Sequence, residues 1–289
     1  MSNLKTIRRN SYHTNLLFCF LLFLYSCNSS RMIIPPKGQT YVPMNKFVND
    51  GEVTNKEYRQ FLNDLKLKND FEKLKIAKID SIGWKYAIVD CSKFITDYQT
   101  SKYDNYPVVN ITYEGAKLYC EWLTERYNNN PKREYKKLLF RLPTEMEWEE
   151  FAKGGKIDYI YPDGYSLSIL NNKKFRYTCN FAAISQGYVK YNIKDELIIE
   201  KDSTTYFAMD DFVQIKPIKS YFPNEYGLFD FAGNVAEMVA EKGITKGGGW
   251  ESSGYYMRIK SSERYTESSC NIGFRVMADI IEEFTNKEK

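Results

Sequence analysis

Residues 224–237 read NEYGLFDFAGNVAE, a stretch in which short apolar runs alternate with the turn-forming residues glycine, asparagine and aspartate. Apolar side chains do not recur here at helical spacing, and no long helical pattern follows anywhere after residue 156. Short runs typical of strands occur instead at 174–179, 213–218, 258–261 and 273–277. The second half of the chain is therefore predicted to be irregular, loop-rich β structure.

Helical signals are confined to the first half of the chain. Thr54 and Glu57 have the spacing of a capping box, in which each side chain accepts a hydrogen bond from the other residue's backbone N–H. Apolar residues then recur every three or four positions, which predicts an amphipathic helix over 55–66. The lysine-rich stretch 66–100 has no clear pattern and is expected to form loops with short elements.

Two further helices are predicted before residue 156. Thr112 caps an apolar stretch that ends at the turn-forming residues 128–131. Thr144 and Glu147 form a second capping box, and Gly154 with the next glycine ends the helix that it starts. Helices in the first half and loop-rich β structure in the second make the predicted fold class α+β.

The N-terminal residues have the pattern of an export signal. Residues 1–15 carry three basic side chains and no acidic one, and the apolar run LLFCFLLFLY follows at 16–25. This run is too short for a bilayer-spanning helix, which takes about 20 residues. Residues 1–26 are therefore interpreted as a secretory signal peptide.

The sequence LYSC at 24–27 resembles the lipobox of bacterial lipoproteins. Cys27 is therefore expected to carry the lipid that anchors the protein to a membrane, with residues 27–40 as a polar tether. The alternative is an ordinary cleaved signal with an incidental cysteine. Because no acidic run follows Cys27, attachment to the periplasmic side of the bacterial outer membrane is preferred to surface display.

Composition excludes several classes of active site. The chain has 289 residues, enough for one large domain, and its one histidine, His13, lies in the export signal. The mature protein would thus lack imidazole, which excludes Ser-His-Asp and Cys-His catalysis and His-ligated metal sites. Without the three basic leader residues, 38 of the 41 basic side chains remain against 37 acidic ones. This near-neutral balance predicts no nucleic-acid partner.

Aromatic residues and cysteines each leave two interpretations open. The 24 Tyr and 18 Phe could form a surface that binds sugars or peptides, or could reflect genome composition. Cys91, Cys120, Cys179 and Cys270 show no C-x-x-C spacing, so a zinc ribbon or thioredoxin motif is excluded. They could form up to two disulfides in three connectivities, or remain buried thiols.

Six segments in collinear order resemble the sulfatase-modifying-factor family, which includes the formylglycine-generating enzymes. They are GEVTNKEY at 51–58, YPVV at 106–109, RLPTEMEWE at 141–149, NEYGLFDFAGNVAE at 224–237, GGGW at 247–250 and NIGFR at 271–275. The resemblance implies a variant of the C-type-lectin-like fold with few regular elements. It places one domain at 41–280, followed by a tail at 281–289, and the family's early glycine-rich strand is abbreviated here to residues 41–44.

The resemblance also places the family's catalytic positions. That family uses one serine and two cysteines, whose thiolates bind copper, and thiolates are the soft ligands that suit Cu(I). The serine falls on Gly249, the first cysteine on Ser252 and the second on Met257. All three positions depart from the family pattern, so copper is not expected and formylglycine-generating activity is in doubt. Cys270, the nearest downstream thiol, is expected to be structural.

Calcium is the cofactor that the resemblance does imply, because hard oxygen ligands remain at the family's metal positions. The first site maps to Asp230, Gly233, Val235 and Glu237, and a second to Asn180, Phe181, Asp210 and Phe212. The alternative is that Asp230 and Glu237 cap turns and that residues 210–211 form a solvated acidic pair.

Three functions remain open from the sequence. The first is a non-catalytic lipoprotein with a structural or partner-binding role at the cell envelope, as in family members of gliding-motility and type IX secretion machineries. The second is an enzyme, of the formylglycine-generating class or another, that uses the same cleft. The third is recognition of a glycan or peptide. Residues that would line the cleft are Trp250, Glu251, Ser252, Tyr255, Tyr256 and Arg258.

Overall fold

The computed structural model describes residues 34–86, 97–162 and 215–285, together with 164, 168–171, 174–181, 183–184, 189–191, 197–199 and 206–207. The chain separates into two units, Met1–Ile33 and Ile34–Lys289. The predicted signal peptide and Cys27 belong to the first unit and lie outside the described residues. The described helices and strands all belong to the second unit.

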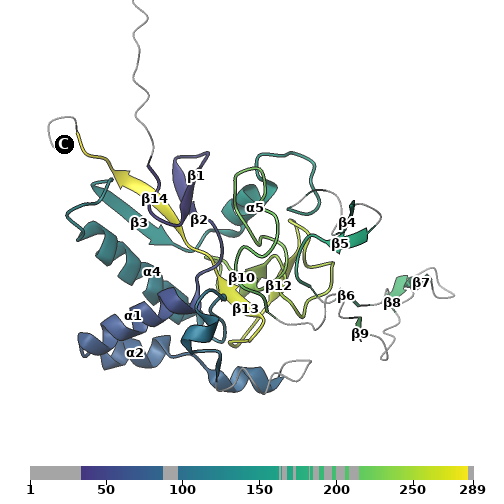
Figure 1. The fold of residues 1–289 in the computed structure, drawn as a ribbon, viewed down its shortest axis with the longest axis horizontal. Coiled ribbons are helices and arrows are strands. Elements are labelled where there is room, and N and C mark those ends of the chain that lie inside the picture. The colour runs from purple at the N-terminus through teal and green to yellow at the C-terminus, as the bar shows by residue number, and fades with distance from the viewer. Residues whose placement is uncertain are drawn as a thin grey trace, which may run out of the picture. The chain divides into compact units, whose positions relative to one another are not determined.

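A four-stranded antiparallel sheet supports the helical half, with strand order β1-β2-β14-β3. The strands are β1 (Gln39–Val42), β2 (Lys46–Asn49), β3 (Lys137–Arg141) and β14 (Met277–Glu282). β14, from the end of the unit, inserts between β2 and β3, so the beginning and the end of the fold share one sheet (Figure 1). Two residues assigned to the tether, 39 and 40, already belong to β1, and β14 extends two residues beyond the predicted domain end at 280.

Four α-helices accompany this sheet among the described residues, all of them before residue 154. They are α1 (Asn55–Leu67), α2 (Phe71–Ala77), α4 (Tyr113–Asn128) and α5 (Glu145–Lys153), with short 3-10 turns η1 (Ser81–Tyr86) and η2 (Ser101–Tyr103). Both predicted capping boxes are present, at the starts of α1 and α5. Gly154 ends α5 in the left-handed conformation at φ 59°, which glycine adopts without strain.

The sheet has a core on each face because its side chains alternate. Phe47, Ala278 and Phe140 are register partners across β2, β14 and β3, and they pack in the cluster that contains the buried faces of α1 and α4. Their sequence neighbours Val48 and Met277 point to the opposite face and pack in the cluster formed with α5. Figure 1 shows α1, α2 and α4 gathered on one side of this sheet.

A second four-stranded sheet, with order β12-β11-β10-β13, brings together the predicted motifs of the second half. Its strands are β10 (Ala236–Met238), β11 (Ile244–Lys246), β12 (Ser262–Arg264) and β13 (Ile272–Phe274). β10 pairs with β13 in parallel, whereas the other two pairs are antiparallel. The segments 224–237, 247–250 and 271–275 therefore meet at this sheet.

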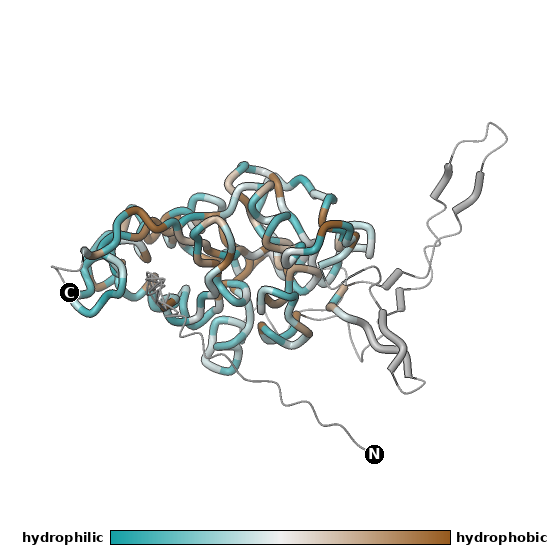
Figure 2. Tube along the Cα trace, turned by 90° about the horizontal axis from the view of Figure 1, so that it is seen from above, coloured by the Kyte–Doolittle hydropathy of each residue, from teal (hydrophilic) through white to brown (hydrophobic). Residues whose placement is uncertain are grey.

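The remaining strands form three two-stranded ladders. They pair β4 (Ser168–Asn171) with β5 (Lys174–Tyr177), β6 (Ala183–Ile184) with β9 (Tyr206–Phe207), and β7 (Val189–Tyr191) with β8 (Leu197–Ile199). Hydrophilic stretches run along most outer turns of the unit (Figure 2). Within the described part of the chain, no helix combines the length and the apolar character needed to cross a bilayer.

The structure corrects three of the strand predictions. Residues 258–261 form turns, because the N–H of Ser261 donates to the Arg258 carbonyl, and the strand begins at Ser262. The predicted strand 273–277 is interrupted after Phe274, where the buried side chain of Arg275 turns to a partner inside the protein. In 213–218, residues 213–214 lie outside the described residues, and 215–218 form no strand.

The described part of the stretch 66–100 contains short elements, as predicted, of which α2 is the longest that lies wholly within it. This helix has only seven residues, which is too short for an apolar period to be read from sequence. Asp70 caps it by accepting a hydrogen bond from the N–H of Lys73. Leu74 of this helix packs against the main core, and this tertiary contact stabilises the helix in a way that its local sequence does not reveal.

Candidate functional site

The glycine-rich segment follows β11 and turns sharply into the region where the family's catalytic residues were placed. Gly247 and Gly248 have φ of 80° and 61°, a conformation that favours glycine. A Cβ atom on Gly247 would lie 2.7 Å from the Phe231 carbonyl oxygen, and one on Gly248 would lie 2.4 Å from the Met257 methyl group. Close packing against a backbone carbonyl group therefore adds to the demand of the turn at Gly247, whereas at Gly248 the close atom is the end of a flexible side chain and the turn is the main reason for glycine.

Gly249 is held just as tightly by a different neighbour. A Cβ atom at this position would lie 2.1 Å from Oδ1 of Asn271 and 2.6 Å from its carbonyl oxygen. The Asn271 side chain in turn accepts a hydrogen bond from the N–H of Glu251 at 3.0 Å. A serine at position 249 would thus require the Asn271 side chain to move.

Ser252 is buried, and its hydroxyl group is fully engaged. Oγ accepts hydrogen bonds from the N–H of Gly249 at 3.0 Å and from Nδ2 of Asn271 at 3.1 Å. It donates to Oε2 of Glu263 over a long distance of 3.4 Å. Burial raises the pKa of Glu263, an effect that the Ser252 hydroxyl opposes. The hydroxyl therefore ties two loops together instead of facing solvent.

Met257 is completely buried and packs with Ala232 and Cys179. The described thiols of Cys120, Cys179 and Cys270 are all buried and form no disulfide with one another, while Cys91 lies outside the described residues. Cys270 lies 4.0 Å from the Glu251 carboxylate.

Among the aromatic residues of the predicted cleft, only Tyr255 is well exposed, with 58% of its surface accessible. Arg258 stacks on its ring at 3.6 Å, and Tyr256 meets the ring edge-on at 5.3 Å. Nε of Arg258 also donates to the Tyr255 carbonyl oxygen. Trp250 is completely buried, and its indole N–H donates to the Cys270 carbonyl oxygen.

The first predicted calcium position centres on a buried ion pair. Glu237 accepts hydrogen bonds from the guanidinium group of Arg275, the shortest at 2.7 Å, and from the indole N–H of Trp148 at 2.7 Å. Arg275 and Glu237 are 0% and 1% exposed. Arg275 also donates to the carbonyl oxygens of Asn49 and Phe229, so it links three segments. The Glu237 carboxylate is therefore already neutralised by a protein cation.

Asp230 lies in the same buried region with one carboxylate oxygen unsatisfied. Its backbone has φ 57°, and Oδ2 accepts a hydrogen bond from the N–H of Lys219 at 2.5 Å. No amide, hydroxyl or ammonium group of a described residue donates to Oδ1 of Asp230 or to Oε2 of Glu52, whose other oxygen accepts from Asn234, but the two carboxyl groups lie within hydrogen-bonding reach of each other. Burial raises the pKa of both carboxyl groups, and their mutual proximity raises that of Glu52 further. A shared proton or a cation would satisfy both oxygens.

Gly233 and Val235 lie between Asp230 and Glu237 on the same loop. Gly233 has φ 76°, and a Cβ atom there would lie 2.2 Å from the Asn180 carbonyl oxygen. The same carbonyl oxygen of Asn180 accepts a hydrogen bond from the N–H of Asn234 at 2.7 Å. Of the second predicted calcium position, Asn180 and Phe181 are described and Asp210 and Phe212 are not.

No group of three or more His, Cys, Asp or Glu side chains converges as metal ligands within the described ranges. A site built partly from backbone carbonyls, as predicted for calcium, needs fewer such side chains. Glu52 and Arg275 are the residues that sequence reasoning did not assign to the site. Arg275 carried a signal, because it is a charge inside the apolar run GFRVMA at 273–278 and such a charge needs a buried partner, whereas Glu52 lies among polar residues and carried none.

The whole unit resembles known proteins in sequence and in fold. The model of the sulfatase-modifying factor enzyme 1-like domain matches residues 28–280. The inactive C-alpha-formylglycine-generating enzyme 2 of Bos taurus is 25% identical over 267 residues, covering 77% of this chain and 73% of that protein. The formylglycine-generating enzyme of Thermomonospora curvata is 31% identical over 137 residues, covering 47% of this chain and 34% of that enzyme.

Two solved structures share the fold. PvdO from Pseudomonas aeruginosa superposes with a TM-score of 0.51 at 18% identity, covering 81% of this chain and 80% of that one. CarF superposes with a TM-score of 0.50 at 19% identity, covering 86% and 96%. The predicted formylglycine-generating-enzyme-like α+β fold is thereby confirmed. Since the family model spans most of the residues, the chain belongs to the family of sulfatase-modifying factor enzyme 1-like domains.

Proposed function

We propose that this protein is a non-catalytic family member with a structural or partner-binding role at the bacterial cell envelope. The observation that carries the proposal is the state of the three former catalytic positions. Gly249 is packed against Asn271, Ser252 has its hydroxyl group engaged by three partners, and Met257 is buried. A hydroxyl and a thioether do not replace a pair of thiolates as ligands for Cu(I).

The similarity to a relative described as inactive supports the same conclusion. Other relatives are described as formylglycine-generating enzymes, so membership of the family alone does not decide between the two roles. Residue chemistry at the three positions supports the non-catalytic role, because the scaffold around them is retained while the thiols are not.

Calcium is proposed as a structural ion of the loop at 230–237. Glu52 takes the place of the predicted ligand Glu237, whose carboxylate is bound by Arg275, and it offers an unsatisfied carboxylate oxygen together with Asp230. The carbonyl groups of Gly233 and Val235 would complete the oxygen set with water. Bound there, the ion would neutralise two buried acids that repel each other. A second calcium is proposed at Asn180 and Phe181 with Asp210 and Phe212.

Attachment through a lipid on Cys27 is proposed for the location, on the periplasmic side of the outer membrane. A role in a secretion or gliding-motility type of assembly is a specific form of this proposal. Lipid attachment at Cys27 predicts that the wild-type protein fractionates with membranes and that a Cys27→Ser variant does not incorporate labelled palmitate. Equal palmitate labelling of the variant would reject the assignment of Cys27.

The surface around the exposed Tyr255, with the half-buried Tyr256 and Arg258 beside it, is proposed to contact the partner, which would be an envelope protein or a glycan. The stacked guanidinium group and aromatic ring offer a flat, partly apolar face of the kind that sugars and peptides bind. A Tyr255→Ala variant tested on a glycan array and by crosslinking in cells addresses this surface. Unchanged binding in the variant would assign recognition elsewhere.

The decisive experiment is a formylglycine assay with the purified protein. Copper, oxygen and a cysteine-containing sulfatase peptide are supplied, and the formylglycine-generating enzyme of Thermomonospora curvata serves as the active control. We expect no aldehyde in the peptide and no copper in elemental analysis. Peptide oxidation above the level without protein would overturn the proposal and favour the alternative of an enzyme that uses the same cleft.

A further inference from the structure

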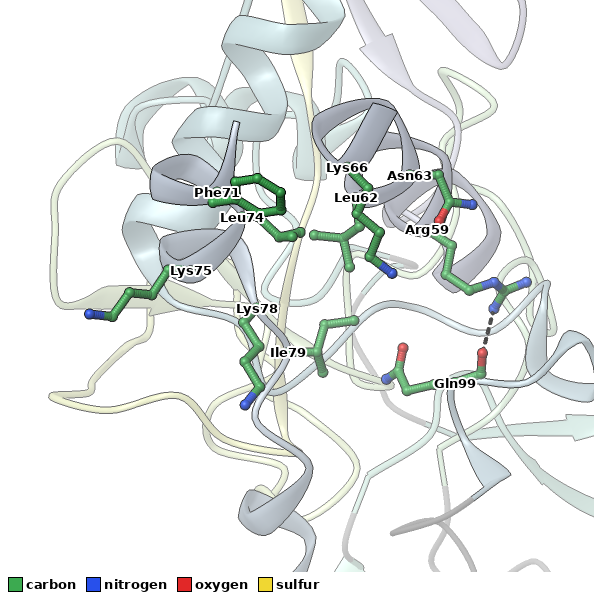
Figure 3. Close-up of a pocket in the computed structure, with 10 residues that line it drawn as sticks. All are labelled: Arg59, Leu62, Asn63, Lys66, Phe71, Leu74, Lys75, Lys78, Ile79 and Gln99. Atoms are coloured by element: carbon green, nitrogen blue, oxygen red, sulfur yellow. Dashed lines mark hydrogen bonds between the residues drawn. The ribbon is translucent and has the colours of Figure 1, made fainter. Parts of the chain in front are cut away.

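A cavity of about 580 Å³ lies beside α1 and α2, away from the positions discussed above. Its lining residues come from α1, α2, the segment after α2 and Gln99: Arg59, Leu62, Asn63, Lys66, Phe71, Leu74, Lys75, Lys78, Ile79 and Gln99 (Figure 3). The volume falls in the range of about 300–1,000 Å³ that is typical of small-molecule sites. The cavity is therefore large enough for one bound molecule.

The floor of the cavity is apolar and firmly supported. Leu62, Leu74 and Ile79 are partly buried and pack against the main core of the domain. Phe71 lines the same cavity but leaves 65% of its surface exposed. Figure 3 shows these four side chains grouped together, with charged side chains around them. Exposed apolar surface of this kind in a concave site favours an aliphatic or aromatic ligand body.

Among the described residues, the lining of the cavity is cationic and contains no acidic side chain. None of the ten lining residues is Asp or Glu. Arg59 is neutralised by an ion pair with Asp104, and it donates to the Gln99 carbonyl oxygen at 3.1 Å. Lys66, Lys75 and Lys78 are exposed, and no described residue forms an ion pair or side-chain hydrogen bond with them. The neighbouring lysines 68 and 73, by contrast, pair with Glu125 and Asp70.

We propose that this cavity binds a single-chain anionic amphiphile, a molecule of the fatty-acid class. Its aliphatic chain would lie over Leu62, Leu74 and Ile79, covered by Phe71. Its carboxylate would lie in the positive field of the rim lysines, whose ammonium groups do not converge on one point (Figure 3). The concave floor favours one molecule over a bilayer surface, because membrane binding uses apolar side chains that project outward. Neither the family resemblance nor the proposed non-catalytic role requires this site.

The test titrates the full chain with dodecanoate below its micelle concentration, followed by calorimetry. We expect saturable binding of one molecule, weakened by added salt because exposed charges are screened. Dodecyltrimethylammonium, with the same chain and a positive head group, should not bind. Equal binding of both amphiphiles, or no saturable binding of dodecanoate, would overturn the proposal.

Variants locate the site. A Lys66→Glu/Lys75→Glu/Lys78→Glu variant should weaken dodecanoate binding about tenfold or more. The matched control, Lys56→Glu/Lys117→Glu/Lys137→Glu, makes the same change of charge at exposed lysines that do not line the cavity, and it should bind as wild type does. Equal weakening of dodecanoate binding in both variants would show that overall charge causes the effect, and it would overturn the assignment of the site.

Two further measurements keep the result independent of folding and of membranes. Phe71→Ser removes an exposed side chain, so folding should be unaffected, while binding should fall about fivefold through lost apolar contact. Anionic phosphatidylglycerol vesicles test the other source of the same chemistry. If the protein bound these vesicles but not dodecanoate, the proposal of a single-molecule site would be overturned in favour of a membrane-binding surface.

Discussion

Single residues in this fold are constrained by the backbone that passes beside them. Gly233 and Gly38 have nearly the same φ, 76° and 77°, yet their surroundings differ completely. A Cβ atom on Gly233 would lie 2.2 Å from the Asn180 carbonyl oxygen, whereas one on Gly38 would meet no atom within 4 Å. The pair therefore separates the cost of a left-handed backbone from the cost of a steric clash.

Alanine at these two positions should destabilise the protein to very different degrees. Gly38→Ala should lower the free energy of unfolding by about 1–2 kcal/mol, the cost of the left-handed conformation alone. Gly233→Ala should lower it by at least about 4 kcal/mol, because the Asn180 carbonyl group must also move. Urea unfolding followed by tryptophan fluorescence measures both. Equal losses would show that the contact with Asn180 is not tight in solution.

The ion pair between Arg275 and Glu237 is the most deeply buried charge pair of the described residues. Arg275→Met would leave the Glu237 carboxylate without its cation and should cost about 3–5 kcal/mol of stability. Adding Glu237→Gln should recover part of this loss, because no uncompensated charge then remains. Arg258→Met on the surface loop is the control and should cost less than about 1 kcal/mol. Urea unfolding of the three variants would contradict the argument if the double variant were the least stable.

Among the helices and strands, the sequence was sufficient to predict an element where its hydrogen-bond partners lie close together in the chain. Thr54 with Glu57 and Thr144 with Glu147 predicted the starts of α1 and α5, because a capping box is completed within four residues. The strand predicted at 258–261 failed because its backbone groups bond within a turn, and 273–277 failed because Arg275 reaches a distant carboxylate.

The site could be predicted only in part for the same reason. The loop 230–237 and its acids were found through the motif, yet the partners of those acids come from elsewhere in the chain. Glu52 approaches Asp230 from the segment between β2 and α1, and Arg275 approaches Glu237 from between β13 and β14. Such long-range pairs follow from sheet topology, which one sequence without its relatives does not specify.

The two capping boxes offer a matched comparison between helices. Glu147 also binds Arg141 at 2.6 Å and Lys46 at 3.2 Å, whereas no ion pair accompanies Glu57 among the described residues. Although burial alone would raise the pKa of Glu147, hydrogen bonds from Arg141 and the Thr144 N–H lower it to about 2. Glu147→Gln should therefore cost about 2 kcal/mol at pH 7, and Glu57→Gln less than about 1 kcal/mol.

The pH dependence gives this prediction a second readout. A depressed pKa in the folded state contributes stability above the unfolded-state pKa, and this contribution is lost as the pH falls toward about 2. The stability difference between wild type and Glu147→Gln should thus shrink between pH 5 and pH 2. Urea midpoints across this range, with Glu57→Gln in parallel, measure it. A difference that stays constant with pH would mean that the ion pairs contribute nothing in solution.

At the scale of the whole molecule, two sheets, the N-terminal hairpin and the motif loops converge on buried polar groups. Arg275 alone connects the end of β2, the loop before Asp230 and β10. A fold with so many loops depends on such connections, since long irregular segments lose more conformational entropy on folding than their few apolar contacts return. The proposed calcium ion would act at the same junction.

Calcium should therefore stabilise the entire unit against unfolding. Binding to the folded state alone adds about 2.7 kcal/mol at a concentration one hundred times the dissociation constant, so the melting temperature should rise with calcium and fall with chelator. Asp230→Gly removes the carboxylate and keeps a residue that tolerates φ 57°, so this variant should lose the calcium-dependent shift. Asp80→Gly, at an exposed aspartate outside the site, should retain it. Scanning calorimetry with calcium, magnesium and chelator measures the shifts in melting temperature. An equal shift in wild type and Asp230→Gly would place the ion elsewhere. No shift in wild type would refute the site.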